Sequence, residues 1–196
     1  MGENLTGEWR ALPDPGQTGQ IRLASLGVSF AAALAVGGVA VARIRVSGGL
    51  WEPDIEEGVP HLCLPLFDGP IPSLWCHVPD DQIALADIVA FRTDRPGLCF
   101  WRRGEVHVPL GAARIDEATF EKQALRLFDN PLDWLRSGGD GAWIGCWRSG
   151  ALLLQGVPDV VCGSVEFARL VDADLRHLGR SRPRVHVIEA AVGLAG

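Results

Sequence analysis

The longest hydrophobic run in the chain covers residues 23–42, contains no charged residue and lies between Arg22 and Arg43. Most of the run is Ala, Ser and Gly, so a helix formed by it would offer lipid little apolar surface around its circumference. We therefore expect a helix packed in a protein core. A membrane span through residues 23–42, or a signal peptide cleaved after Ala42, remains an alternative. The large side chains recur at the spacing of one helical stripe, at Leu23, Leu26, Phe30 and Leu34.

A change from helical to alternating spacing follows Gly37 and Gly38, which are typical of a helix end. Residues 40–46 alternate between apolar and basic side chains and predict a strand. From residue 59 to 110, short apolar segments are separated by Pro, Gly and Asp, which predicts an antiparallel meander. Within it, "TDRPGL" is typical of a hairpin turn.

The last third of the chain combines helical and strand patterns. Asp116 is expected to cap a helix, and Asn130 followed by Pro131 predicts the start of another. A strand, a helix capped by Ser164 and a second strand are expected from residue 158 to 188. The segments "AWIGCW" and "ALLLQG" fit either a hairpin or a strand followed by a short helix. The helix after Asp116 is expected to bury Phe120, Ala124, Leu127 and Phe128, and the helix after Ser164 to bury Phe167, Val171, Leu175 and Leu178.

These patterns together predict an α/β protein of the mixed α+β kind. We expect a flexible tail over residues 1–22, a helix with a β meander over 23–110, and an α/β region over 111–196 that packs with the meander as one domain.

The composition of the chain indicates the class of protein and its cellular compartment. The chain has 196 residues, 47% of them hydrophobic, which is enough for a sizeable core, and a net charge of -6 that argues against a globally basic nucleic-acid binder. The cysteines are odd in number, include no CxxC pair and lie mostly in apolar runs, which is typical of free thiols in a reducing compartment. We therefore expect a soluble, cytoplasmic protein.

Three segments of the middle of the chain, "GLWEPD", "DIVAFRTDRPGLCFWRRGE" and "NPLDWLRSGGDG", resemble uncharacterised proteins carried on prophages and mobile elements of GC-rich proteobacteria. The resemblance rests on the spacing of Trp, Pro and Gly. It implies a bacterial, mobile-element setting and no activity, cofactor or site residue.

The first candidate site is a basic and aromatic hairpin. Strand alternation puts Trp101 and Arg103 on one face, where an aromatic ring beside a guanidinium could stack on single-stranded nucleic acid. The alternative is a structural strand pair with arginines at its wet edge. The candidate nucleic-acid-binding residues are Arg92, Trp101 and Arg103.

The second candidate is an anion site at Gly163 and Ser164, which join an apolar strand to a helix whose first N–H groups could hold a phosphate. GxGxxG and the Walker lysine are both missing, so the pattern favours generic anion binding over a dinucleotide or P-loop site. The alternative is simple helix capping by Ser164.

The sequence gives weaker support for a metal site and for a catalytic nucleophile. The soft ligands His61, Cys63, Cys76 and His77 lack the spacing of a zinc knuckle. Asp172 and Asp174 diverge on a helix, and Arg176 is an ion-pair partner for Asp172. No serine or cysteine lies in a catalytic motif. We therefore predict no metal site and no cofactor.

The function predicted from the sequence is that of a non-catalytic binding or accessory protein of a mobile element. Its partner is expected to be single-stranded nucleic acid or another protein, and a membrane is not expected. One alternative is an enzyme acting on a phosphate-containing or nucleic-acid substrate near Gly163 and Ser164. The other is a protein anchored to a membrane by residues 23–42.

Overall fold

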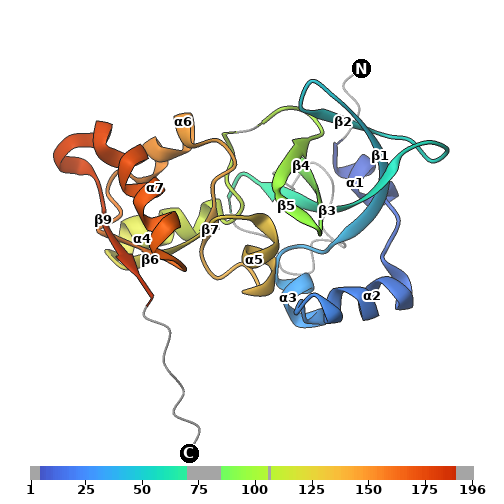
Figure 1. Cartoon of the computed structure of the whole chain (residues 1–196), viewed down its shortest axis with the longest axis horizontal. Coiled ribbons are helices and arrows are strands. Elements are labelled where there is room, and N and C mark those ends of the chain that lie inside the picture. Colours follow the sequence, from blue (N-terminus) through green and yellow to red (C-terminus); the bar gives the residue numbers. More distant parts are fainter. Residues whose placement is uncertain (1–4, 70–84, 106, 189–196) are drawn as a thin grey trace, which may run out of the picture.

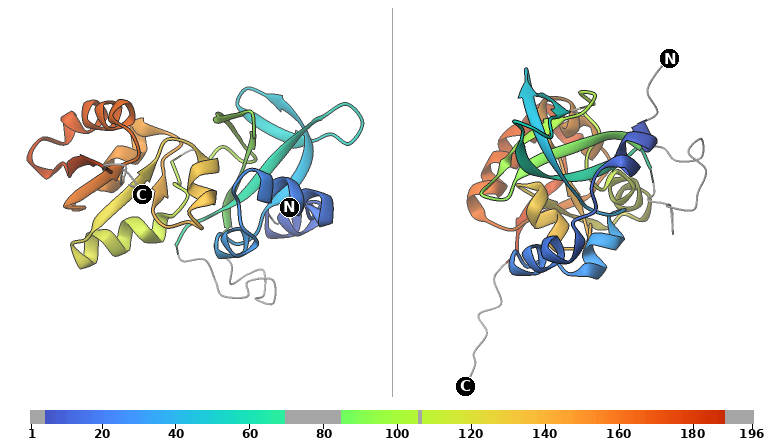
Figure 2. Two further views of the ribbon diagram at one scale, coloured as in Figure 1. Left: turned by 60° about the horizontal axis from the view of Figure 1, so that its bottom comes forward. Right: turned by 90° about the vertical axis from the view of Figure 1, so that its right-hand side faces the viewer.

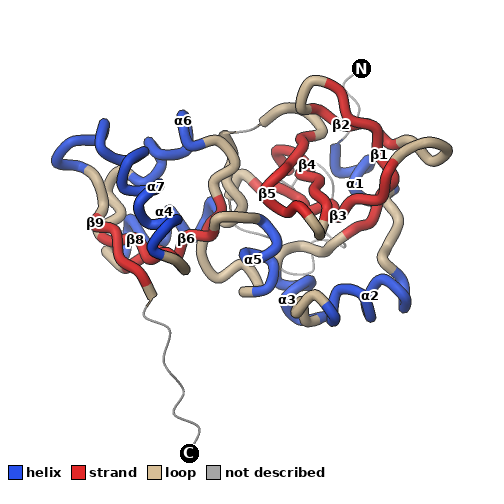
Figure 3. Tube along the Cα trace, viewed as in Figure 1, coloured by secondary structure: helices blue, strands red, loops and turns tan. Residues whose placement is uncertain are grey.

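The computed structural model describes residues 5–69, 85–105 and 107–188 and contains two lobes, an N-terminal β-barrel with helices and a C-terminal α/β unit (Figure 1). Helices and strands occur in both, which confirms the mixed α+β class. The barrel lobe contains α1 (Leu5–Ala11), α2 (Gly16–Ser25), α3 (Phe30–Ala35), β1 (Ala40–Ser47), β2 (Leu50–Pro53), β3 (Val59–Phe67), β4 (Leu85–Arg92) and β5 (Arg95–Trp101). Figure 3 shows the strands of the barrel lobe above α2 and α3, which lie along its lower side. The α/β lobe contains α4 (Ala112–Glu121), β6 (Ala124–Phe128), α5 (Pro131–Arg136), β7 (Ala142–Trp143), α6 (Trp147–Gly150), η3 (Ala151–Leu154), β8 (Asp159–Cys162), α7 (Val165–Leu175), η4 (Arg176–Ser181) and β9 (Arg184–Val187).

The barrel closes in the order β1-β2-β5-β4-β3. Neighbouring strands are antiparallel, as expected for a meander, except at the seam, where β2 and β5 pair in parallel through Leu50 and Trp101. The alternation predicted for β1 is confirmed, because Ala40, Ala42 and Ile44 are buried in one cluster with Trp51 of β2. The apolar runs predicted between residues 70 and 84 lie outside the described residues.

The N-terminal residues differ from the sequence-based expectation. Residues 5–25 form α1 and α2 instead of a flexible tail, and Trp9 of α1 is buried against the barrel. The expected single helix after residue 23 is divided, because Gly27 at φ +79° follows the end of α2 and Ser29 caps α3 by accepting the N–H of Ala32.

This division changes the buried face. Leu23 is buried as predicted, whereas Phe30 and Leu34 are 65% and 61% exposed, and the buried residues are instead Val28, Ala32 and Val36. Among the residues that the structure describes, no helix has both the length and the apolar character to span a bilayer.

The predicted hairpin is present between β4 and β5. Its turn lies at Thr93 and Asp94, two residues before the expected position, and Pro96 and Gly97 belong to β5. Arg92 and Arg95 are paired across the turn, where the register shifts.

The α/β lobe is built on a parallel sheet with the strand order β7-β6-β8-β9. Its C-terminal strand-helix-strand unit is as predicted: Ser164 caps α7, four predicted positions are buried, and β8 and β9 are parallel neighbours. The predicted helix start at Asn130 is also confirmed, because Asn130 Oδ1 accepts the N–H of Asp133 at 3.0 Å. The undecided segments form β7, α6 and η3.

The helix expected after Asp116 differs in both its start and its buried face. α4 begins after Gly111, ends at Glu121 and leaves Phe120 88% exposed. Lys122, at φ +57°, stops the helix, and the next apolar residues form β6 instead of extending the helical face.

A buried cluster joins the two lobes. It combines barrel residues such as Leu64 and Phe91 with Leu135 of α5 and Trp143 of β7. At the same boundary, the rings of Trp101 and Trp143 are stacked with their centroids 6.5 Å apart. The two views in Figure 2 show the α/β lobe packed against the barrel and its N-terminal helices.

Candidate functional site

The strand order of the parallel sheet creates a crevice at the carboxyl ends of β6 and β8. From β6 the chain turns through α5 to β7 on one side, and from β8 it turns through α7 to β9 on the other. The two helices lie on opposite faces, because Leu127 packs with α7 and its neighbour Phe128 packs with α5. In open parallel sheets, ligands bind where connections diverge in this way.

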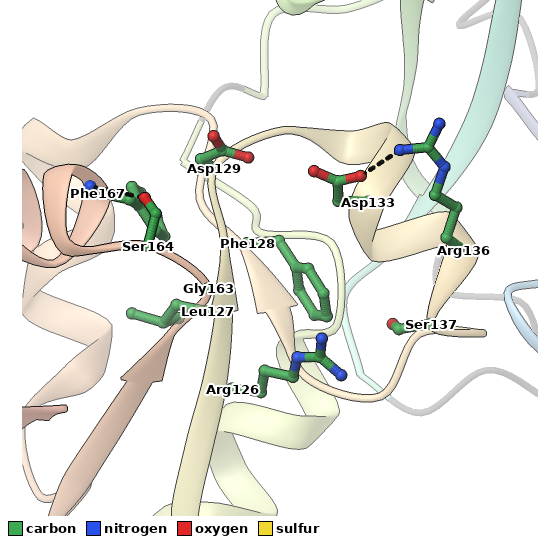
Figure 4. Close-up of a pocket in the computed structure, with 10 residues that line it drawn as sticks. All are labelled: Arg126, Leu127, Phe128, Asp129, Asp133, Arg136, Ser137, Gly163, Ser164 and Phe167. Atoms are coloured by element: carbon green, nitrogen blue, oxygen red, sulfur yellow. Dashed lines mark hydrogen bonds and ion pairs between the residues drawn. The ribbon is translucent and has the colours of Figure 1, made fainter. Parts of the chain in front are cut away.

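A cavity of about 460 Å³ occupies this position (Figure 4). This volume is within the range of pockets that hold small molecules. Its walls come from the end of β6, from α5 and from the start of α7. The lining residues are Arg126, Leu127, Phe128, Asp129, Asp133, Arg136, Ser137, Gly163, Ser164 and Phe167.

Gly163 and Ser164 form one wall of the cavity. The Ser164 side chain accepts the N–H of Phe167 at 3.1 Å, so the hydroxyl caps α7 as the structural interpretation predicts. Helix geometry leaves the N–H groups of Val165 and Glu166 without an acceptor inside the helix, at its positive end. A Cβ atom added to Gly163 would meet nothing within 4 Å, so this wall faces open space.

Arg126 brings an available cation to the cavity. Its guanidinium carbon lies 4.8 Å from the centroid of the Phe128 ring, which orients the side chain along the face of the sheet. Within the described ranges, no carboxylate or carbonyl group binds this guanidinium, so all its N–H groups are available to a ligand.

The α5 side of the cavity is held by local polar contacts. Asn130 Nδ2 donates to Asp129 at 2.5 Å and to Asp133 at 2.8 Å, which keeps the two carboxylates close together. Arg136 donates to Asp133 at 2.5 Å and to the carbonyl oxygen of Leu26 at 2.7 Å. The charge of Asp133 is thereby balanced, whereas Asp129 is exposed at the mouth of the cavity.

Comparison of the chain with protein-family models, with curated proteins and with solved structures finds no match. The resemblance to mobile-element proteins stays a prediction.

The residues proposed to bind nucleic acid occupy structural positions. Trp101 is half-buried and stacked on Trp143, while Arg92 forms an ion pair with Asp94 at 2.6 Å. Arg103 pairs with Glu8 of α1, which also binds Arg102 at 2.8 Å. The hairpin therefore fits the structural interpretation. Trp101 stacks on Trp143 of the same chain, and Arg92 and Arg103 form ion pairs within the protein.

The weaker metal candidates do not converge in the described structure. His61 is buried, with Nδ1 2.8 Å from the carbonyl oxygen of Val59, and Cys63 is fully buried. Cys76 and His77 lie outside the described residues. Asp172 accepts from Arg176 at 3.4 Å and from Arg182 at 3.1 Å, as expected for a solvated helix face. The described residues contain no cluster of three or more groups able to hold a metal ion.

The thiols of the four described cysteines differ in pKa, and this difference predicts the order in which they are alkylated. Burial raises the pKa of Cys63 and of Cys99 to about 12 and that of Cys162 to about 11. A hydrogen bond with the Ser149 side chain lowers the pKa of the half-buried Cys146. Because the thiolate is the nucleophile, we expect iodoacetamide at pH 8 to alkylate Cys146 first among these four, as measured by peptide mapping over time. Faster alkylation of Cys63 or Cys162 in the folded protein would contradict this order.

Sequence reasoning identified one wall of the cavity and missed the other. Arg126 and Arg136 lie in segments whose patterns indicate only an apolar helix face and a helix end. The signal that could have located this wall is the pair of polar residues directly after the segment "ALRLF", Asp129 and Asn130, but it is informative only once that segment is assigned as a strand.

Proposed function

We propose that this chain is a binding protein that holds a phosphate-bearing small molecule in the crevice between β6 and β8. The observation that carries the proposal is the cavity at the point where the connections of a parallel sheet diverge. The first N–H groups of α7 supply donors for an anion at one wall of the cavity, and the guanidinium of Arg126, stacked on Phe128, supplies a cation at another.

The remaining polar groups narrow the ligand further. The exposed carboxylate of Asp129 is an acceptor, and it repels a second anion at that point. It therefore favours a ligand whose phosphate faces the start of α7 and whose hydroxyl or amino group faces Asp129. A phosphorylated sugar or a nucleotide has this arrangement of groups, and the volume of about 460 Å³ is sufficient for a molecule of that size.

For the biological role and the cellular location of the protein, the predictions made from the sequence stand unchanged. A non-catalytic accessory role in a mobile element and a cytoplasmic location are compatible with such a site. The enzyme alternative uses the same crevice, so a bound ligand is the first observation that either interpretation requires.

Gly163 offers a direct test, because it lines the cavity and a Cβ atom added to it would meet no protein atom within 4 Å. We expect the wild-type protein to be stabilised in a thermal-shift screen by at least one member of a panel containing inorganic phosphate, pyrophosphate, sugar phosphates and nucleotides. Isothermal titration with that compound should show at least tenfold weaker binding to Gly163→Leu.

The matched control is Gly97→Leu. Gly97 is exposed on β5, has free space around an added Cβ atom just as Gly163 does, and has no left-handed backbone conformation. Equal affinity in Gly97→Leu and wild type, with loss in Gly163→Leu, supports the crevice. Stabilisation by no compound of the panel, or equal affinity in both variants, would overturn the proposal.

A further inference from the structure

A second cavity, of about 380 Å³, lies in the barrel lobe between α2 and the neighbouring strands β1 and β3, and it shares no lining residue with the crevice. Its strand side is apolar, because Val41 of β1 and Leu62 of β3 are register partners and both line it. Its volume is within the range of pockets that hold small molecules. The apolar lining residues are Pro13, Leu23, Leu26, Val41, Pro60 and Leu62, with Pro15 at the start of α2.

Helix α2 covers this cavity and is held by backbone contacts at its two ends (Figure 1). Before the helix, the carbonyl oxygen of Pro13 accepts the N–H of Val41 at 3.2 Å. After it, the carbonyl oxygen of Leu26 accepts from Arg136 Nε at 2.7 Å. Among the 10 residues of α2, all of which the structure describes, Leu23 is the only buried one. Because so little of α2 packs on the barrel between its two ends, the space beneath it stays open and the helix can move to admit a molecule.

Arg22 supplies a cation at the wall of this cavity. It lies exposed in the last turn of α2, and within the described ranges no acidic side chain or carbonyl group binds its guanidinium. The acidic residue of the wall, Asp14, lies before the other end of the helix, and its Oδ1 accepts the N–H of Gly16 at 2.7 Å. The other polar side chains of the wall belong to Thr18, His61 and Thr93.

We infer that this cavity binds a small apolar carboxylate, with its hydrocarbon part between α2 and the barrel and its carboxylate at Arg22. The inference goes beyond the proposed function, because it concerns a second site in the other lobe. A mostly apolar wall with few polar groups is typical of pockets that bury the body of a ligand and orient it by one end. A guanidinium binds a carboxylate through two parallel hydrogen bonds, whereas a neutral ligand would leave Arg22 to water and a cation would be repelled.

The experiment compares octanoate with octanol as probes of the full chain by isothermal titration. An apolar cavity without a cation would favour octanol, because a carboxylate loses more hydration than a hydroxyl on entering it. We expect the opposite order, with octanoate bound roughly five- to tenfold more tightly, the effect of a charge-assisted pair with an exposed arginine. In Arg22→Gln this preference should be lost, while the affinity for octanol changes less than about twofold.

Arg169→Gln is the matched control for the charge. Arg169 is also exposed on a helix, α7, and it lines no part of this cavity. Both affinities should equal those of wild type in Arg169→Gln, which separates an effect at the cavity from the loss of one positive charge of the protein.

Thr18→Trp tests where the hydrocarbon part lies. Thr18 is exposed on α2 and lines the cavity, so an indole ring there should occlude it and weaken the binding of both probes by roughly tenfold or more. Gln17→Trp adds the same ring at the neighbouring position of α2, outside the cavity wall, and should bind both probes as wild type does.

Three results would overturn the inference: octanol bound as tightly as octanoate, an unchanged preference in Arg22→Gln, or equal binding to Thr18→Trp and Gln17→Trp. A lack of octanoate binding at millimolar concentration would overturn it as well. All of these outcomes leave phosphate binding in the crevice standing, since the two cavities have no lining residue in common.

Discussion

Replacement of Asp87 by alanine is expected to destabilise the barrel lobe by about 3–5 kcal/mol, because the loss leaves one buried and three partly buried N–H groups without an acceptor. Asp87 is fully buried and accepts four backbone N–H groups. One is that of Ile88 at 2.7 Å, and the other three belong to the segment after β5, from Arg103, Gly104 and Glu105, at 2.8–2.9 Å. For a chain of this size, the loss corresponds to a decrease in Tm of roughly 10 °C.

Chemical denaturation and calorimetry measure this effect. Asp94→Ala is its control, since Asp94 is 56% exposed and forms a surface pair with Arg92, whose contribution should be below about 1 kcal/mol. Asp87→Asn keeps the shape of the side chain but offers one oxygen acceptor in place of two, so it should lie between wild type and Asp87→Ala. A free energy of unfolding for Asp87→Ala within about 1 kcal/mol of wild type would show that these contacts are not needed.

Replacement of Gly141 by alanine is expected to cost about 3–5 kcal/mol, the sum of backbone strain and overpacking. Gly141 has φ +128°, and an added Cβ atom would lie 2.4 Å from the carbonyl oxygen of Arg126 and 3.0 Å from the Phe128 ring. Both neighbours belong to β6 at the crevice, so phosphate affinity should fall together with stability.

Gly48→Ala separates the two causes. Gly48 also has a left-handed φ, of +60°, but an added Cβ atom there would meet nothing within 4 Å. Its cost should be about 1 kcal/mol, from backbone strain alone. Similar losses in Gly48→Ala and Gly141→Ala would mean that the close approach to Arg126 is relieved by a small shift of the chain.

The parts of the fold that could be predicted are those with local signals. β1 follows from alternation along its own residues, and the starts of α5 and α7 follow from Asn130 and Ser164, whose side chains cap the next turn. Each of these features depends on residues within a few positions of one another. The candidate anion site at Ser164 was found for the same reason, since a capped helix after an apolar strand can be recognised directly.

The parts that were missed depend on contacts between distant residues. Closure of the barrel requires Leu50 to pair with Trp101, which no pattern within either segment indicates. β6 has apolar residues at spacings that also fit a helix, and the backbone of Lys122 together with pairing to β7 and β8 decides for a strand. Arg126 reaches the cavity only because of that pairing, so the second wall of the site could not be predicted.

The order of the strands has a consequence for folding during synthesis. The barrel seam can close once Trp101 has left the ribosome, which happens before any residue of the parallel sheet does. The sheet then begins with its interior strand β6 and grows outward, and the edge strand β9 is added last. Part of the apolar surface of the barrel, at Leu64 and Phe91, shares one buried cluster with Leu135 and Trp143, so it is covered completely only after α5 and β7 have emerged. The contact between Arg136 and Leu26 then forms when α5 reaches a barrel that is already closed.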